Sequence, residues 1–317
     1  MPILNALADA LAWLGRQGTR ALALSIFFGL AVPSLAAYVK PYLGEAVFVL
    51  LLFSYLRTDP AALLRHVKSP MLAIAAALWA MLAAPLLFGS AYVLAGVREE
   101  FPALYTIMIL QAAVAPITSL AAFAAIMALD VEFTLLTLIM CSALSPLTSV
   151  AISYLFLGNS LFSPIELGIK LFFFYAASGA AAFAIRRIAG RRWIERQKDR
   201  VDGLNVVAVF VFAIVAMESV PRHVMADPLF AATLLGLILV LSCLLIGISM
   251  LVFLRAGPAA GMVIGMLATF RNIGLVMATL GAVLPDTAWF YFGLVQFPIY
   301  LFPLALKPLA RRLAAAR

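Results

Sequence analysis

Polar residues interrupt an apolar run in residues 261–281, GMVIGMLATFRNIGLVMATLG, where Thr269, Arg271 and Asn272 stand together. An arginine at the middle of a membrane span costs at least about 2.5 kcal/mol, so it normally faces protein or water rather than lipid. A guanidinium is a planar, permanently charged fork that matches a carboxylate, and a nearby hydroxyl and amide add donors to it. This stretch therefore predicts a buried site for an anion, most simply a carboxylate.

A second stretch, residues 101–129, has the same form. Its apolar run is interrupted at Gln111, Pro116, Thr118 and Ser119. Irregular backbone at membrane depth survives only where it lines a cavity or is buried in protein. Two interrupted segments at matching places in a chain are typical of a transporter's binding site. We therefore expect two broken helices, with Pro116 and Gly274 at the breaks.

The composition sets the class of protein that must position these residues. The chain has 317 residues, of which 66% are hydrophobic and 11% charged, and its mean hydropathy is +1.11. These values are far from those of soluble proteins, so we expect an all-α integral membrane protein. The first 19 residues lack the pattern of a cleavable signal peptide and predict a short amphipathic helix on the membrane surface. Cys141 and Cys243 lie in apolar runs with no metal-binding spacing, so no cofactor is expected.

The apolar runs predict ten membrane-spanning segments, each judged against the ~20 residues that a bilayer requires. The expected segments cover residues 20–39, 42–57, 71–95, 102–129 (broken), 132–157, 164–188, 204–219, 228–255, 258–284 (broken) and 287–309.

The distribution of basic residues predicts the orientation. With the N-terminus inside, 17 of the 22 lysines and arginines fall on the cytoplasmic side, and only Lys40, Arg98 and Arg222 fall outside. This bias favours a bacterial-type inner membrane with both termini in the cytoplasm. Attraction to membrane lipids accounts for the net charge of +8 without a nucleic-acid partner.

The ten segments divide into two halves within one integral membrane domain. Residues 1–157 would hold the amphipathic helix and five segments, and residues 158–317 the other five, with a basic cytoplasmic loop at 186–203. Because five is odd, the second half must enter the membrane with the opposite orientation. The broken fourth and ninth segments then correspond to each other, as an inverted repeat requires.

Two motifs at these positions resemble the bile acid:sodium symporter superfamily, over nearly the whole chain in length and segment count. The first runs from Ala115-Pro116 to Asp130 and on to SALSPLTS at residues 142–149. The second is FRNIGL at residues 270–275, where Gln-Asn-Ser-Gly-Leu is common in the family. The resemblance implies a panel formed by segments one, two, six and seven. The other six segments would form a core in which the broken helices cross.

The chain departs from this family at the sodium sites that the resemblance implies. Leu267 stands where sodium-coupled relatives carry a glutamate, and Arg271 stands where they carry the Gln. The remaining candidate groups for an ion or for coupling are Thr134, Thr137, Ser142 and Asp130. These cannot balance the lost carboxylate, so Na⁺ is disfavoured as a cofactor.

Two interpretations of Arg271 follow. In the first, the guanidinium takes the place and charge of the missing sodium, with the positive ends of nearby half-helices adding to it. The anion would then bind a substrate site formed by Arg271, Asn272, Thr269, Thr118, Ser119 and Gln111. In the second, Arg271 pairs with carbonyl groups at the end of a half-helix in the fourth segment and never contacts substrate.

The sequence thus predicts a secondary transporter that moves a small organic anion by alternating access, with degenerate sodium sites. A membrane receptor that binds a ligand without moving it, and a conventional Na⁺-coupled symporter, are the alternatives. An enzyme is not expected, because the acidic residues lie near the ends of the spans and form no catalytic set.

Overall fold

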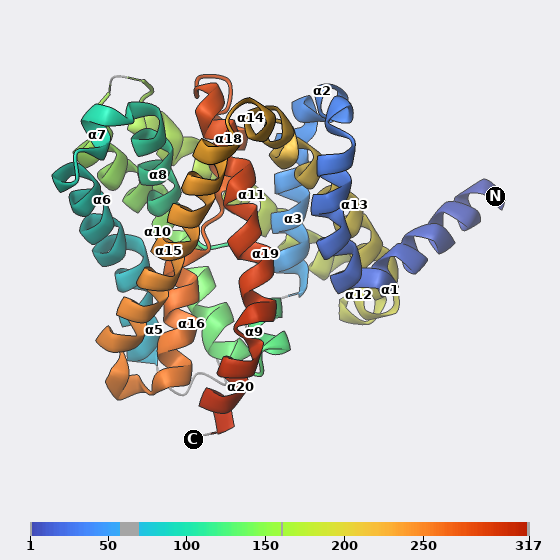
Figure 1. Cartoon of the computed structure of the whole chain (residues 1–317). Helices are drawn as coiled ribbons and strands as arrows, with labels where there is room; N and C mark the ends of the chain where they lie inside the picture. The colour runs from blue at the N-terminus through green and yellow to red at the C-terminus, as the bar shows by residue number, and fades with distance from the viewer. Residues whose placement is uncertain (1, 58–69, 160, 316–317) are drawn as a thin grey trace. The chain divides into compact units, whose positions relative to one another are not determined.

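The chain is almost entirely helical in the residues that the computed structural model describes, which are 2–57, 70–159 and 161–315 (Figure 1). Within these residues, seven helical stretches are long and apolar enough to cross a membrane. They cover 33–56, 70–94, 131–157, 164–189, 198–226, 228–252 and 286–305. The protein is therefore an all-α integral membrane protein, as the composition predicts.

The chain forms two compact units, each built from two separate parts of the sequence. Unit 1 comprises residues 1–59 and 173–226, and unit 2 comprises residues 60–172 and 227–317. Both interrupted stretches lie in unit 2. The units are therefore not the two sequential halves, since each draws on both.

The long helix of unit 1, α1 (Pro2–Ala31), packs along α13 (Lys198–Met217). Gly15 and Gly203 allow this approach, because a Cβ at either position would collide with the backbone of the opposite helix. The boundary expected at residue 20 is wrong, since one helix covers both the predicted surface helix and the start of the first span. The helix ends just before Val32, because a residue that precedes proline is disfavoured in the α conformation.

The first span is expected to continue to residue 39, but from Pro33 on the chain forms short helical pieces instead. They are η1 (Pro33–Leu35), α2 (Ala36–Val39) and η2 (Lys40–Tyr42), and α3 (Leu43–Arg57) then matches the second span. The loop expected at 186–203 is also wrong, because this stretch is helical. α11 (Pro164–Ala189), α12 (Arg191–Arg196) and α13 follow one another with bends at Gly190 and Gln197. Gly190 has a φ of 77°, a conformation that favours glycine.

Unit 2 carries the elements that surround the two interruptions. The third span forms α5 (Pro70–Leu78), a π turn η3 (Trp79–Ala83) and α6 (Ala84–Leu94). The fifth and eighth are the long helices α10 (Val131–Leu157) and α15 (Pro228–Val252). Short helices α7 (Val97–Glu100), α14 (Val220–Ala226, in unit 1) and η4 (Leu254–Ala256) complete the connections.

Both interrupted segments are broken helices. The fourth consists of α8 (Pro102–Ala113) and α9 (Leu120–Ile126), and the ninth of α16 (Pro258–Thr269) and α17 (Ile273–Leu280). α16 packs beside α15 (Figure 1), and Gly265 permits the close contact because a Cβ there would meet the backbone of Ile246. Small residues at such contacts are common between membrane helices.

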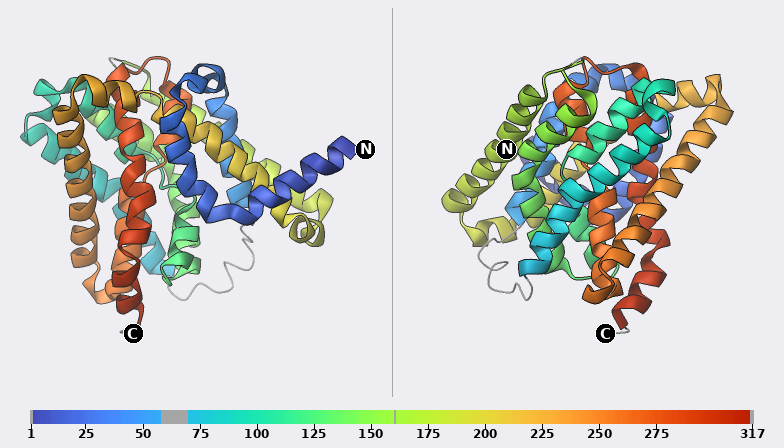
Figure 2. Two further views of the ribbon diagram at one scale, coloured as in Figure 1. Left: turned by 45° about the vertical axis from the view of Figure 1, so that its right-hand side comes forward. Right: turned by 90° about the vertical axis from the view of Figure 1, so that its left-hand side faces the viewer.

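The tenth span, expected at 287–309, is found at 286–305, but its helix is interrupted and a further helix follows it. α18 (Asp286–Leu294), α19 (Gln296–Ala305) and α20 (Lys307–Ala315) follow one another toward the C-terminus, coloured red in Figure 2. Pro298 lacks the N–H that would donate to the carbonyl of Leu294, and Pro308 lacks the N–H that would donate to the carbonyl of Leu304. The two prolines therefore account for the interruptions at Val295 and Leu306.

Candidate functional site

The two helix breaks pair with each other through the backbone. Pro116 and Arg271 face each other in an isolated antiparallel bridge. The N–H of Ile117 donates to the carbonyl of Phe270 at 2.8 Å, and the N–H of Asn272 donates to the carbonyl of Ala115 at 2.9 Å. Backbone groups that leave a helix inside a membrane need new partners, and each break supplies them for the other.

Two serines of α10 satisfy further backbone groups of the first break. The hydroxyl of Ser149 donates to the carbonyl of Ala113 at 3.0 Å, and the hydroxyl of Ser145 accepts from the N–H of Ala115 at 3.0 Å. Both serines are fully buried. Because they are four residues apart on one helix, they lie on the same face and reach successive groups of the break.

Arg271 completes this set of bonds around the first break. Its side chain is buried, with the residue only 2% exposed, and Nη1 donates to the carbonyl of Val114 at 3.1 Å. Nη2 donates to the carbonyl of Ala80, and Nη1 also lies 3.3 Å from the sulfur of Met81. The guanidinium thus joins both breaks to the π turn of the third span.

The π turn explains why the carbonyl of Ala80 can accept this bond. The N–H of Ala84, its usual partner one α turn later, donates to Trp79 instead. The next residue is Pro85, which has no N–H to offer. An unsatisfied carbonyl buried in a membrane protein is costly, and the guanidinium of Arg271 satisfies it.

The charge of Arg271 lies at the negative end of a half-helix. Val114 is the residue that caps the C-terminus of α8, and carbonyl ends carry the negative part of a helix dipole. The expectation that positive helix ends surround this guanidinium is therefore wrong for its direct contacts. The pairing with a carbonyl at the end of the fourth segment's half-helix is the contact that the second interpretation of Arg271 predicts.

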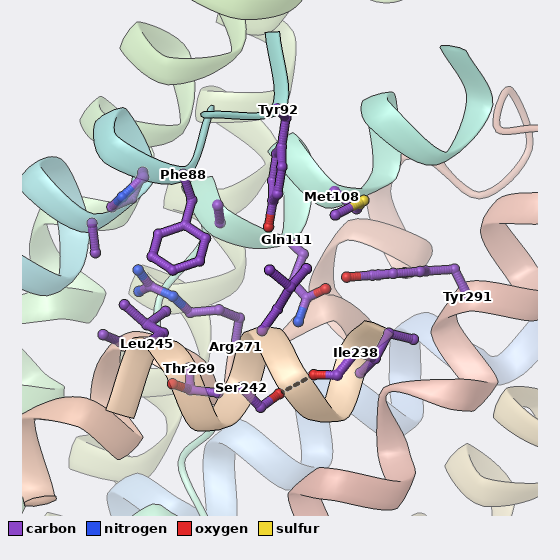
Figure 3. Close-up of a pocket in the computed structure, with 15 residues that line it drawn as sticks. Phe88, Tyr92, Met108, Gln111, Ile238, Ser242, Leu245, Thr269, Arg271 and Tyr291 are labelled. Carbon is purple, nitrogen blue, oxygen red and sulfur yellow. Dashed lines mark hydrogen bonds between the residues drawn. The ribbon is translucent and has the colours of Figure 1, made fainter. Parts of the chain in front are cut away.

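Arg271 also lines a cavity of about 70 Å³ in unit 2, together with Thr269 and Gln111 (Figure 3). The hydroxyls of Tyr92 and Tyr291 both point toward the Gln111 amide in this view. The buried Oε1 of Gln111 has no hydrogen-bond partner among the described residues. The cavity therefore combines a fixed cation with a polar group available to a ligand.

The other predicted substrate residues lie around the bridge rather than in this cavity. Thr118, Ser119 and Asn272 are partly buried, at or directly beside the paired backbones. The hydroxyl of Thr269 lines the cavity but donates to the carbonyl of Gly265 in its own helix. Gly274 lies inside α17, so the second break is residues 270–272 and the assignment of Gly274 as a break residue is wrong.

The candidate coupling residues lie along α10 and are not gathered at the cavity. Asp130 caps the N-terminus of α10 by accepting from the N–H of Phe133, and it is exposed. The hydroxyls of Thr134 and Thr137 donate to carbonyls one turn earlier in the same helix. Ser142 is buried in the middle of the helix. This arrangement does not assemble a cation site from these four residues.

No group of three or more potential metal ligands occurs among the residues that the structure describes. Both cysteines lie in apolar runs of the sequence, but only Cys141 is buried in the structure, and Cys243 is exposed.

Comparisons with known proteins add no family assignment. Neither family models nor curated proteins match this sequence.

Several residues of the site have roles that their place in the sequence does not reveal. They are Ser145, Ser149, Ala80, Tyr92 and Tyr291. Pro85 is the one signal in the sequence for the free carbonyl of Ala80, and the i,i+4 spacing of Ser145 and Ser149 is the signal for a polar face toward the break.

Proposed function

We propose that this protein is a secondary active transporter that moves a small organic anion across the inner membrane by alternating access. It would be a divergent member of the bile acid:sodium symporter type without a working sodium site. The observation that carries the proposal is the pairing of two broken helices beside a cavity that holds a buried guanidinium. Discontinuous helices with irregular backbone at membrane depth are the usual binding sites of secondary transporters.

The contacts of Arg271 support the replacement of a coupling cation by a side chain. Its guanidinium binds the carbonyl oxygens of Val114 and Ala80. Oxygen atoms of this kind are the ligands that hard cations take in proteins. The guanidinium would offset the partial negative charge of these carbonyl groups as a bound Na⁺ would, and it would occupy the place of that ion. Transport would then be uniport or coupled to protons.

The two interpretations of Arg271 are then compatible. A guanidinium has five N–H donors in a plane, so it can hold backbone carbonyls on one side while its charge acts on an anion in the cavity. Gln111 lines the same cavity, and the N–H groups of its amide can donate to that anion.

The segment composition of the compact units also supports this proposal. Unit 1 contains the first two segments with most of the sixth and seventh, and unit 2 contains the others. These units agree with the division into panel and core that the resemblance implies. A ten-segment inverted repeat with cytoplasmic termini belongs to the same proposal.

Sealed proteoliposomes test the function directly. Purified protein should accumulate a radiolabelled organic anion in the lumen, and a detergent pulse should release it. Anion that is bound but not released into the lumen would instead indicate a receptor, and a chemically altered anion would indicate an enzyme.

A further inference from the structure

A second, apolar cavity of about 560 Å³ lies in unit 2 between α6, α8 and α15. Its volume is within the range of about 300–1,000 Å³ that is typical of ligand pockets. Of its 16 lining residues, only Tyr92 and Thr233 carry a polar group. The α15 residues recur at helical spacing on one face, from Phe230 to Ile248.

This apolar cavity lies directly beside the cavity of Arg271. Phe88, Tyr92, Met108 and Leu241 line both. A molecule that occupies both would therefore place one end near Gln111 and Arg271 and the rest among leucine and phenylalanine side chains. The combined space matches an amphiphile with one anionic end.

The apolar part selects against a body that carries hydroxyl groups. A hydroxyl that enters such surroundings loses its water and finds almost no partner, which weakens binding. An alkyl chain has no hydrogen bonds to water to lose, and burial of each methylene group strengthens its binding. The lining therefore favours a plain hydrocarbon chain over a hydroxylated ring system.

The apolar cavity also opens toward the surroundings of the protein. Leu237 and Leu244 on its α15 side are 45% and 50% exposed, and α15 is apolar enough to cross a membrane. In a bilayer such an opening meets lipid tails, so a chain can enter from the side.

We propose that the two cavities together bind a straight-chain alkyl carboxylate, with the carboxylate near Arg271 and Gln111 and the chain between α6, α8 and α15. This inference rests on the proposed function, because it names the substrate class of the same site.

The test is competition for a fluorescent alkyl carboxylate bound to the protein in nanodiscs, with empty nanodiscs as the blank for partition into lipid. Competitors are the straight-chain carboxylates from butanoate to hexadecanoate. Affinity should rise about fourfold for each added methylene group until the cavity is filled. The alcohols of equal length, and carboxylates on a polyhydroxylated ring, should compete at least ten times more weakly.

Two variants test whether the alkyl chain of the ligand lies in the apolar cavity. Leu237→Trp fills the cavity and should lower the affinity for dodecanoate at least tenfold, and Leu244→Trp provides a second variant in case the first does not fold. Leu251→Trp is the matched control on the same helix, because Leu251 is 66% exposed and lines neither cavity. Affinity that does not depend on chain length, or an equal effect of Leu237→Trp, Leu244→Trp and Leu251→Trp, would overturn the inference.

The outcomes separate this inference from the proposed function. If the affinity rises with the length of the alkyl chain but no carboxylate accumulates in proteoliposomes, the result supports the inference and contradicts transport. Accumulation of short anions with no advantage for longer chains contradicts the inference and leaves transport standing.

Discussion

Pro116 and Arg271 lie opposite each other in a short antiparallel bridge, so the backbones of two helix breaks about 150 residues apart form one structural unit. The imide of Pro116 has no N–H, and the bridge does not require one, because the flanking residues make both hydrogen bonds. The Arg271 side chain leaves from this bridge and bonds to Val114 and Ala80. One residue thus takes part in the bridge through its backbone and in the cavity through its charge.

The bond from Ala115 to Ser145 should stabilise the first break. In Ser145→Ala the buried N–H of Ala115 loses its acceptor, which should cost about 1–3 kcal/mol. Thermal unfolding of the purified protein in detergent measures this loss. Thr148→Ala is the control, because the Thr148 hydroxyl donates only to carbonyls of its own helix among the bonds that the structure describes. Equal stability of the two variants would show that Ser145 does not support the break.

Arg271 and Pro85 should be coupled in their effects on stability. Arg271→Met leaves the carbonyls of Ala80 and Val114 without their donor and should destabilise the fold by about 1–3 kcal/mol for each group. Pro85→Ala restores an N–H that can serve Ala80. The double variant should therefore lose less than the sum of the two single losses, by about 0.5–3 kcal/mol. Strict additivity in unfolding experiments would contradict the assignment of Ala80 as the acceptor that Pro85 leaves free.

Gln111 should matter for uptake and not for stability. Gln111→Leu removes a buried oxygen that has no partner among the described residues, so the unfolding temperature should stay the same or rise. The variant also lacks the amide N–H groups that can donate to the anion. Uptake of the anion into proteoliposomes should therefore fall about tenfold, corresponding to the loss of roughly 1.4 kcal/mol of binding.

Gln296→Leu is the matched control for this prediction. Gln296 is buried, donates to the carbonyl of Phe292 and lines neither cavity. Its replacement should lower stability and leave uptake per folded molecule unchanged. A loss of uptake that follows stability in both variants would remove Gln111 from the site.

The ion pair on α11 should be structural. The Nζ of Lys170 lies 2.7 Å from Oε1 of Glu166, four residues earlier, and it also donates to the carbonyl of Thr279. Glu166→Gln should change stability by less than about 1 kcal/mol, because both side chains are partly exposed. Uptake that retains its dependence on pH in this variant agrees with a structural pair, and loss of that dependence would indicate a proton relay.

The sequence predicts much of this fold because polar and apolar residues separate clearly along it. The helices at 70–94, 131–157, 164–189 and 228–252 lie within a few residues of the predicted spans. Both broken helices follow from their polar interruptions, which no continuous membrane helix tolerates without a partner. The first span is wrong in detail near Pro33, where the helix ends. The tenth span is found at 286–305, but the interruption at Val295 inside it is not predicted.

The contacts of the site are harder to predict than its residues. Arg271, Thr269 and Gln111 stand out as polar residues in apolar runs, and the structure places all three at one cavity. Their partners are mostly backbone carbonyls, which every residue carries, so the sequence does not distinguish Ala80 or Val114. The division into two units depends in the same way on long-range packing.

We propose that the fixed charge of Arg271 replaces a coupling cation in the transport of an anion. The most direct test is uptake of an organic anion into proteoliposomes under a Na⁺ gradient, a proton gradient or none, for the native protein and for Arg271→Gln. The native protein should accumulate the anion equally well with and without Na⁺, and Arg271→Gln should lose at least about tenfold in uptake. Uptake that strictly requires Na⁺, or uptake that is unchanged in Arg271→Gln, would contradict the claim.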